Sequence, residues 1–141
     1  MPEAIRHSPR SVPPARRVAV RAAVAAACLL ARQPPGRIRA VLTWLRRGSR
    51  PATFAQAAAL RRDVEAVSLR CAGREGCLPR SLATVLLGRA GGRWATWCVG
   101  VRRIAPFGAH AWVEAEGIAV GESYPPGYFV VLFTVPSDQD R

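Results

Sequence analysis

The stretch between residues 77 and 122 changes its hydrophobic spacing from helical to alternating, and no other feature limits the fold of this 141-residue chain as strongly. Its first apolar residues recur at the spacing of one helix face. These residues are Leu78, Leu82, Val85 and Leu86. Residues 93–103 and 109–114 then alternate and carry aromatic and β-branched side chains, which predicts strands. The order predicts an α+β fold, in which N-terminal helices come first and the helix after residue 77 packs on a small antiparallel sheet.

Cys77 lies just ahead of that predicted helix, where a thiol can become reactive. Pro79 favours a helix start, since proline lacks an N–H and is well tolerated in the first turn. The positive end of a helix dipole lowers the pKa of a thiol from about 8.5, and free backbone N–H groups there can hold an oxyanion. Gly76 allows the backbone to approach closely. Cys77 is therefore the candidate nucleophile, and Gly88 is the expected end of the helix.

His110 lies at the start of a predicted strand, Ala109 to Glu114. Alternation places Trp112 and Glu114 on the same strand face as the imidazole. An imidazole can take a proton from a thiol and later return it to a leaving group, so His110 is the candidate base.

The turn after this strand decides which carboxylate faces His110. A two-residue loop at Glu116-Gly117 would put Glu122 opposite Ala111, on the far face. A three-residue loop over residues 115–117, with glycine in the left-handed position, is a common hairpin form and pairs Glu122 with His110. We expect the three-residue loop, and therefore expect Glu122 to orient the imidazole as the third member of a triad.

Four segments match a known family pattern in their order along the chain. They are Cys77-Leu78-Pro79-Arg80-Ser81-Leu82, Val99 to Arg103, Phe107, and His110 to Glu114. Over about residues 70–135 the chain thereby resembles the leader peptidases of lasso-peptide biosynthesis, known in their stand-alone form as the B-protein. The resemblance implies a transglutaminase-like or papain-like fold, with Cys77 as nucleophile and His110 as base. The family often has Asp where this chain has Glu122.

The resemblance also implies a function and partners. The function is that of a cysteine peptidase that cuts the leader from a ribosomally made lasso-peptide precursor. The partners are the precursor leader, a separate small leader-recognition protein, and a cyclase that uses ATP to close the ring. The chain contains no phosphate-binding glycine loop, so any use of ATP is expected in the cyclase, and we expect no cofactor here.

Two other functions compete with this interpretation. A transglutaminase-like acyl transferase would use the same residues with an amine acceptor in place of water, and the mass of the product separates the two reactions. A non-catalytic basic binding module would keep Cys77 and His110 as structural residues. Selective, pH-dependent alkylation of Cys77 would favour an enzyme, and slow, equal alkylation of all thiols would favour the module.

The net charge of +12 is unevenly distributed, and every basic residue is arginine. Residues 1–70 carry 14 Arg and 3 acids, whereas residues 71–141 carry 7 Arg and 6 acids. A basic half can bind nucleic acid, an anionic membrane surface or an acidic protein. No helix-turn-helix, zinc-finger or RNA-binding motif accompanies the arginines, so we expect no nucleic acid and regard an acidic leader or partner as the alternative to a solvated surface.

The four cysteines, Cys28, Cys71, Cys77 and Cys98, lack the Cys-x-x-Cys spacing of a zinc site, so no metal is expected. The chain is neither short nor cysteine-dense enough to depend on disulfides, which indicates a reducing cytoplasm.

The apolar run after Arg16-Arg17 has the outline of an export signal. Arg21 interrupts it, and residues 22–31 are too few for a membrane span, which takes about 20 residues. We expect instead a helix, Val18 to Ala31, that packs on the domain.

The expected organisation has four parts. Residues 1–15, with four prolines, form a disordered arm, residues 16–70 a basic helical region, residues 71–136 the peptidase core, and residues 137–141 a tail. Two further helices are expected in the basic region, namely Ile38 to Arg47, and Phe54 to about Leu69 with Thr53 as N-cap. The last strand is expected from Tyr128 to Val135.

Overall fold

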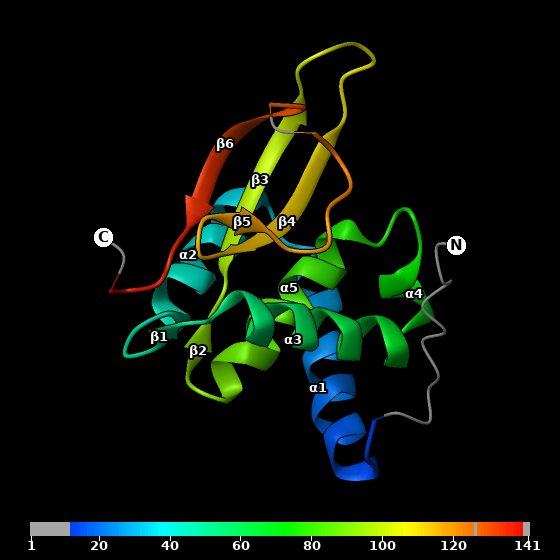
Figure 1. Cartoon of the computed structure of the whole chain (residues 1–141), viewed down its shortest axis with the longest axis vertical. Coiled ribbons are helices and arrows are strands. Elements are labelled where there is room, and N and C mark those ends of the chain that lie inside the picture. The colour runs from blue at the N-terminus through cyan, green and yellow to red at the C-terminus, as the bar shows by residue number, and fades with distance from the viewer. Residues whose placement is uncertain (1–11, 126, 140–141) are drawn as a thin grey trace.

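The structure is a computed structural model that describes residues 12–125 and 127–139. Most of the expected disordered arm, residues 1–11, and the end of the tail, residues 140–141, lie outside the described residues. The elements, in chain order, are α1 (Pro14–Leu30), α2 (Pro35–Leu45), β1 (Arg50–Pro51), α3 (Phe54–Val67), α4 (Leu69–Ala72), α5 (Cys77–Ala90), β2 (Arg93–Trp94), β3 (Thr96–Arg102), β4 (Ala109–Ala115), β5 (Ile118–Ala119) and β6 (Phe129–Val135) (Figure 1).

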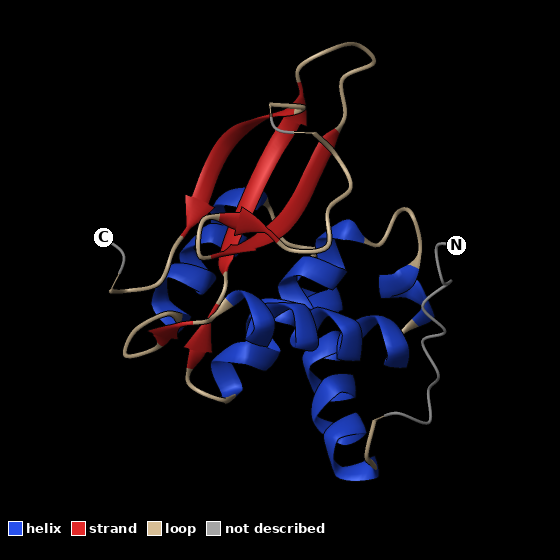
Figure 2. Cartoon of the chain, in the orientation of Figure 1, coloured by secondary structure: helices blue, strands red, loops and turns tan. Residues whose placement is uncertain are grey.

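The described strands form a four-stranded antiparallel sheet in the order β5-β4-β3-β6, and a short parallel pair, β1-β2. Figure 2 shows the larger sheet as one layer and most of the helices gathered below it, with α5, which Figure 1 labels, near their centre. The expected α+β fold, with its nucleophile helix against a small antiparallel sheet, is confirmed.

The N-terminal helices share one hydrophobic core with α5 and the sheet. Val20 of α1 and Val64 of α3 are fully buried together with Leu82 of α5 and Trp97 of β3, which is 1% exposed. Burial of one large apolar side chain stabilises a fold by about 1.5–3 kcal/mol, so these helices contribute substantially to the domain. Within the described part of the chain, none of the helices combines the length and the apolar character that crossing a membrane requires.

The helix starts show how proline and capping residues set the boundaries. Helices α1 and α2 begin at Pro14 and Pro35, earlier than the expected starts, because proline fits the first turn of a helix. The expected N-cap of α3 is confirmed: Thr53 accepts a hydrogen bond from the backbone N–H of Gln56, whose side chain accepts one from the N–H of Thr53. Ser68 then ends α3 in an extended conformation and caps α4.

Helix α5 begins at Cys77 itself, so Cys77 is its first residue and does not lie ahead of it. The expected end at Gly88 is wrong, because the helix continues to Ala90. A Cβ on Gly88 would lie 3.0 Å from Cδ1 of Leu60 in α3 and 3.2 Å from the carbonyl oxygen of Arg93. This glycine therefore allows two helices to pack closely and does not end one.

The segment expected as one strand from residue 93 to residue 103 is two strands, β2 and β3, interrupted at Ala95. Strand β2 leaves the main sheet because it pairs in parallel with β1, through backbone hydrogen bonds that flank Pro51. The indole Nε1 of Trp94 donates a 2.9 Å hydrogen bond to the carbonyl oxygen of Val135, which ties this corner to the end of β6.

The hairpin between β4 and β5 has a two-residue loop, so the expected three-residue loop is wrong. Glu116 and Gly117 both have positive φ, 55° and 76°, which is the type I′ geometry of two-residue hairpins. The backbone pairs are Glu114 with Ala119 and Ala115 with Ile118. In this register Glu122 is not the cross-strand neighbour of His110.

Candidate functional site

A folded loop fixes Cys77 at the N-terminus of α5. Gly76 is the N-cap, and a Cβ on it would collide with the carbonyl oxygen of Arg70 and lie 3.0 Å from that of Cys71, so no side chain fits there. The guanidinium of Arg80 donates hydrogen bonds to the carbonyl oxygens of Cys71 at 3.0 Å and Gly73 at 3.4 Å. Arg80 of α5 thus holds the loop that leads into Cys77, the first residue of the same helix.

The first turn of α5 is also anchored to the sheet. The indole Nε1 of Trp97, on β3, donates a 3.1 Å hydrogen bond to Oγ of Ser81, which itself donates to the carbonyl oxygen of Leu78 at 2.9 Å. Trp97 is 1% exposed, so its N–H would have no water to replace this acceptor. The bond sets the position of the helix N-terminus relative to β3 and β4.

His110 lies on β4 within an aromatic cluster. Its ring stacks on Phe129 with centroids 4.7 Å apart and on Trp112 at 5.7 Å, and meets the edge of Tyr124 at 5.7 Å. Opposite it on β3 is Gly100, where a Cβ would lie 2.9 Å from Cη2 of Trp112. The glycine makes room for the indole, and the rings hold the imidazole in place.

Glu122 reaches His110 by a route that the hairpin register does not supply. After Val120 the chain leaves the sheet through Gly121, which has a φ of 69°. The guanidinium of Arg61, on α3, packs against Gly121 and donates to the carbonyl oxygen of Val120. It also lies 3.7 Å from Oε1 of Glu122. Arg61 therefore directs this bend toward the imidazole.

The imidazole Nε2 of His110 lies 3.2 Å from Oε1 of Glu122, and the two side chains are only 12% and 11% exposed. The expected contact is therefore present, although the expected register is not. The N–H of Nε2 is poorly aligned with this oxygen and has no other hydrogen-bond partner among the described residues, so the contact is best described as a close ion pair. Nε2 is therefore the imidazole nitrogen that faces the carboxylate.

The surroundings of Cys77 favour its thiolate. A hydrogen bond with the His110 side chain is the largest influence and lowers the pKa of the Cys77 thiol, against the opposing effect of burial. The backbone N–H of Ala111 and the positive charges of His110 and Arg80 lower the pKa further. Strand β5 ends before it could pair with Ala111, so this N–H on the edge of β4 is left to face the sulfur.

The imidazole and the carboxylate stabilise each other's charge. Burial is the largest influence on the pKa of His110 and lowers it, but contacts with Cys77 and Glu122 together outweigh burial and raise the pKa to about 9. Burial likewise acts to raise the pKa of Glu122, yet His110, Arg61 and Arg80 bring it below its ordinary value. The three groups therefore support one another's charged forms: the pKa of the thiol and that of the carboxyl group are lowered, and the pKa of the imidazole is raised.

The remaining cysteines are free thiols in other surroundings. Cys71 and Cys98 are fully buried, and burial raises the pKa of both; the charge of Glu114 contributes at Cys98. Cys77 therefore stands apart from these two buried thiols by the direction of its pKa shift.

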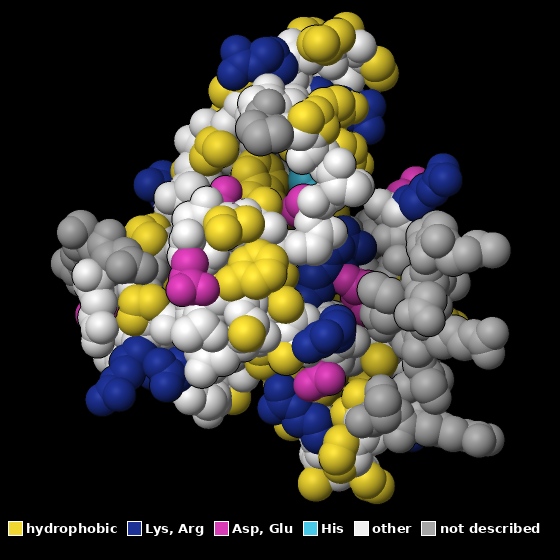
Figure 3. All heavy atoms as spheres, viewed as in Figure 1, with side chains coloured by type: hydrophobic (Ala, Val, Ile, Leu, Met, Phe, Trp, Pro, Cys, Tyr) yellow, Lys and Arg dark blue, Asp and Glu magenta, His cyan; other side chains and the backbone are white. Residues whose placement is uncertain are grey.

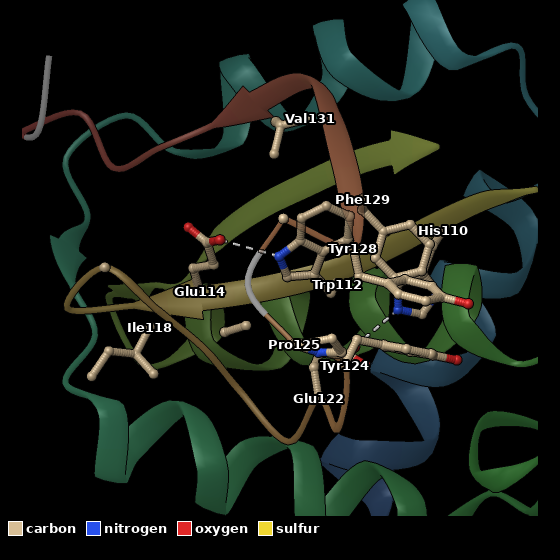
Figure 4. Close-up of a pocket in the computed structure, with 13 residues that line it drawn as sticks. His110, Trp112, Glu114, Ile118, Glu122, Tyr124, Pro125, Tyr128, Phe129 and Val131 are labelled. Carbon is tan, nitrogen blue, oxygen red and sulfur yellow. Dashed lines mark hydrogen bonds and ion pairs between the residues drawn. The ribbon is translucent and has the colours of Figure 1, made fainter. Parts of the chain in front are cut away.

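A cavity of about 430 Å³ opens beside the imidazole (Figure 4). His110 and Glu122 line one part of it and Glu114 another, while its walls are largely aromatic. The aromatic lining residues are Trp112, Tyr124, Tyr128 and Phe129. In Figure 3 the described histidine appears as a small cyan area between yellow hydrophobic side chains. Sequence reasoning missed this cavity, and the clustered aromatic residues after Glu122 were the signal that could have found it.

Sequence reasoning also missed Arg61, which approaches the site from α3, 61 residues before Glu122. The loop of residues 105–108 does not line the cavity, and Phe107 on it is 78% exposed.

Comparison with known proteins gives one family match. A family model described as "Transglutaminase-like superfamily" matches residues 20–134, from within α1 to within β6. No curated protein and no solved structure matches the chain. The matched region includes Cys77, His110 and Glu122, together with the helices that precede them.

Proposed function

The chain belongs to the transglutaminase-like superfamily. We propose that, within it, the chain is a cysteine peptidase that removes the leader from a ribosomally made lasso-peptide precursor, with Cys77 as nucleophile, His110 as acid and base, and Glu122 as the group that orients the imidazole. Family membership supports peptidase or acyltransferase chemistry in general. The observation that carries the proposal is the 3.2 Å pairing of His110 with Glu122 at the N-terminus of α5, where Cys77 is the first residue; the lowered pKa of the Cys77 thiol agrees with it.

In the first step the thiolate of Cys77 attacks the carbonyl carbon of the scissile peptide bond. The negative charge moves to the carbonyl oxygen. Backbone N–H groups of the first turn of a helix have no acceptor within the helix, so those of Cys77 and Leu78 are suited to donate to this oxygen.

In the second step the C–N bond breaks and the imidazolium of His110 gives its proton to the leaving amine, which leaves a thioester on Cys77. A water molecule then loses a proton to His110 and attacks the thioester. The carboxyl product departs, and the proton on His110 balances the restored thiolate. Glu122 stabilises the imidazolium form of His110 in both steps.

The specific substrate rests on the four matching sequence segments. They support a leader peptidase that works with a separate leader-recognition protein and with a cyclase that uses ATP. The basic half of the chain is suited to an acidic leader or partner. Because the thiol must stay reduced, we place the reaction in the cytoplasm.

The test is reconstitution with a precursor peptide encoded beside this gene, with and without the neighbouring leader-recognition protein. Cleavage at one bond, with one ¹⁸O atom in the leader carboxylate when the reaction is run in H₂¹⁸O, is the expected result. Cys77→Ala should give no product, whereas Cys28→Ala should behave as the unmodified protein. Absence of cleavage when all three components are present, or cleavage that survives Cys77→Ala, would refute the proposal.

An acyl transferase is the second candidate, because the same thioester can react with an amine and the family supports such chemistry. If a primary amine is added and the leader is released mainly as its amide, with little free carboxylate, acyl transfer is the function. If the product carries only ¹⁸O, hydrolysis is the function.

A further inference from the structure

The cavity beside His110 extends along β4 and away from the nucleophile. His110, Trp112 and Glu114 are alternate residues of one strand face, and all three line the cavity, whereas Cys77 does not. Figure 4 shows Trp112 between Glu114 and His110. The cavity therefore lies on the imidazole side of the site.

The two carboxylates that line the cavity differ in their interaction partners. Glu122 is paired with His110 and with Arg61. Glu114 accepts a 3.2 Å hydrogen bond from the indole Nε1 of Trp112, and no cation of the described residues lies within ion-pair distance of it. Glu114 is thus a negative charge that lines an aromatic cavity without a partner of opposite charge.

We propose that this cavity is a subsite for the side chain of a lysine or arginine in the substrate, on the amine side of the scissile bond; the inference rests on the proposed acyl chemistry of Cys77. Aromatic faces attract a cation, and Glu114 supplies the opposite charge. A volume of about 430 Å³ is ample for one long side chain. Phe129 and Val131 line the cavity and offer apolar contacts to the methylene stem.

The side of the bond follows from the role of His110. The imidazolium gives its proton to the leaving amine, so the segment after the scissile bond leaves from the His110 side. Glu114 follows His110 four positions further along the strand, which is about 13 Å at 3.3 Å per residue. One or two extended residues cover about 3.5–7 Å of this distance, and a long basic side chain covers most of the remainder. The first or second residue after the bond is therefore the one that fits.

Other side chains should fit less well. An acidic side chain would be repelled by Glu114, and the cost of removing its charge from water would not be offset by a group of opposite charge. An uncharged side chain of the same length could fill the space but would provide no positive charge to pair with Glu114.

The experiment measures binding to the Cys77→Ala protein, so that no turnover is needed. N-acetyl-lysine amide, N-acetyl-arginine amide, N-acetyl-norleucine amide and N-acetyl-glutamate amide are titrated by calorimetry, with tryptophan fluorescence as a second readout. Norleucine matches lysine in its carbon chain and lacks only the ammonium group. We expect the two basic amides to bind about 5- to 30-fold more tightly than norleucine amide, as a partly desolvated cation in such surroundings should.

Two charge variants at the same hairpin complete the test. Glu114→Gln, which keeps an acceptor for Trp112, should abolish the preference for the basic amides. Glu116→Gln removes the same charge from the exposed turn outside the cavity and should leave the preference unchanged. Equal or tighter binding of norleucine amide, a preference that survives Glu114→Gln, or no binding of any amide would overturn the inference. Since Cys77 is absent, these outcomes are independent of whether the peptidase proposal holds.

Discussion

Glu122→Gln separates the charge of Glu122 from its shape. Glutamine has nearly the same size, and Arg61 keeps its other contacts, with Glu65 at 2.6 Å and with the carbonyl oxygen of Val120. The bend after β5 should therefore remain in place. The variant removes the negative charge that faces the imidazole of His110.

The size of the effect follows from the pKa of His110. Its rise from 6.5 to about 9 corresponds to about 3 kcal/mol in favour of the imidazolium, at about 1.4 kcal/mol for each pKa unit. Cys77 and Glu122 supply this together against the opposing effect of burial. Loss of Glu122 removes one of the two contributions that raise this pKa, so the variant lowers the pKa of His110 from about 9.

The assay is the rate of alkylation of Cys77 as a function of pH, together with the ultraviolet absorbance of the thiolate. The ion pair of thiolate and imidazolium exists between the lowered pKa of Cys77 and the raised pKa of His110. In the variant the imidazolium stabilises the thiolate less, so the low-pH edge of this range moves upward. The high-pH edge moves downward, because His110 loses its proton at a lower pH. The pH range in which the ion pair of thiolate and imidazolium exists is therefore narrower in the variant at both ends.

Two further variants make this reasoning refutable. Glu75→Gln removes an exposed acid two residues before Cys77 and should leave both edges unchanged. Glu122→Asp shortens the side chain by one carbon–carbon bond, about 1.5 Å, so the 3.2 Å contact with His110 should lengthen and the range should narrow. If Glu122→Gln alkylates with the same pH profile as the unmodified protein, Glu122 does not stabilise the imidazolium and the argument fails.

Two stability predictions follow from the way the site is supported. Gly100→Ala would place a Cβ 2.7 Å from the carbonyl oxygen of Val130, and should lower the free energy of unfolding by about 1–3 kcal/mol in urea denaturation. Gly36→Ala, where nothing lies within 4 Å, should cost nothing, and an equal loss for both would contradict the packing argument. Ser81→Ala would leave the buried indole N–H of Trp97 without its acceptor and should lower the free energy of unfolding by about 1–3 kcal/mol; an unchanged unfolding midpoint would show that this bond does not anchor α5.

Local patterns predicted the elements well where they are repeated or capped. The helical spacing after residue 77, the N-cap at Thr53 and the alternation of the strand that carries His110 all have local causes, and the structure contains each of them. The ends of the helices and strands also depended on contacts between elements that are distant in the sequence. Gly88 is a glycine inside a helix because Leu60 of another helix packs against it, and no local pattern contains that contact.

The contact between His110 and Glu122 was predicted for the wrong reason. The sequence allowed two loop lengths, and the preference for the longer one overlooked that Glu116 can adopt a left-handed conformation, at φ 55°. The carboxylate then reaches the imidazole through the bend at Gly121 and the guanidinium of Arg61. That arrangement depends on a helix some 60 residues away, which sequence spacing cannot reveal.

The cavity illustrates the same limit. Trp112, Tyr124 and Phe129 come from a strand, a loop and another strand, and they meet around His110 only because β3 lies between β4 and β6. The division of the chain into a basic helical region and a peptidase core stays a prediction.

Competitive alkylation of the four cysteines at about pH 6, followed by peptide mass spectrometry, tests the central claim most directly. An ordinary thiol is almost entirely protonated at this pH, so labelling reports a thiolate that is stabilised by its surroundings. We expect Cys77 to be labelled well before Cys28, Cys71 and Cys98, and His110→Ala to remove this lead while Cys28 is unaffected. Labelling of Cys77 no faster than Cys28, or a lead that persists in His110→Ala, would contradict the account.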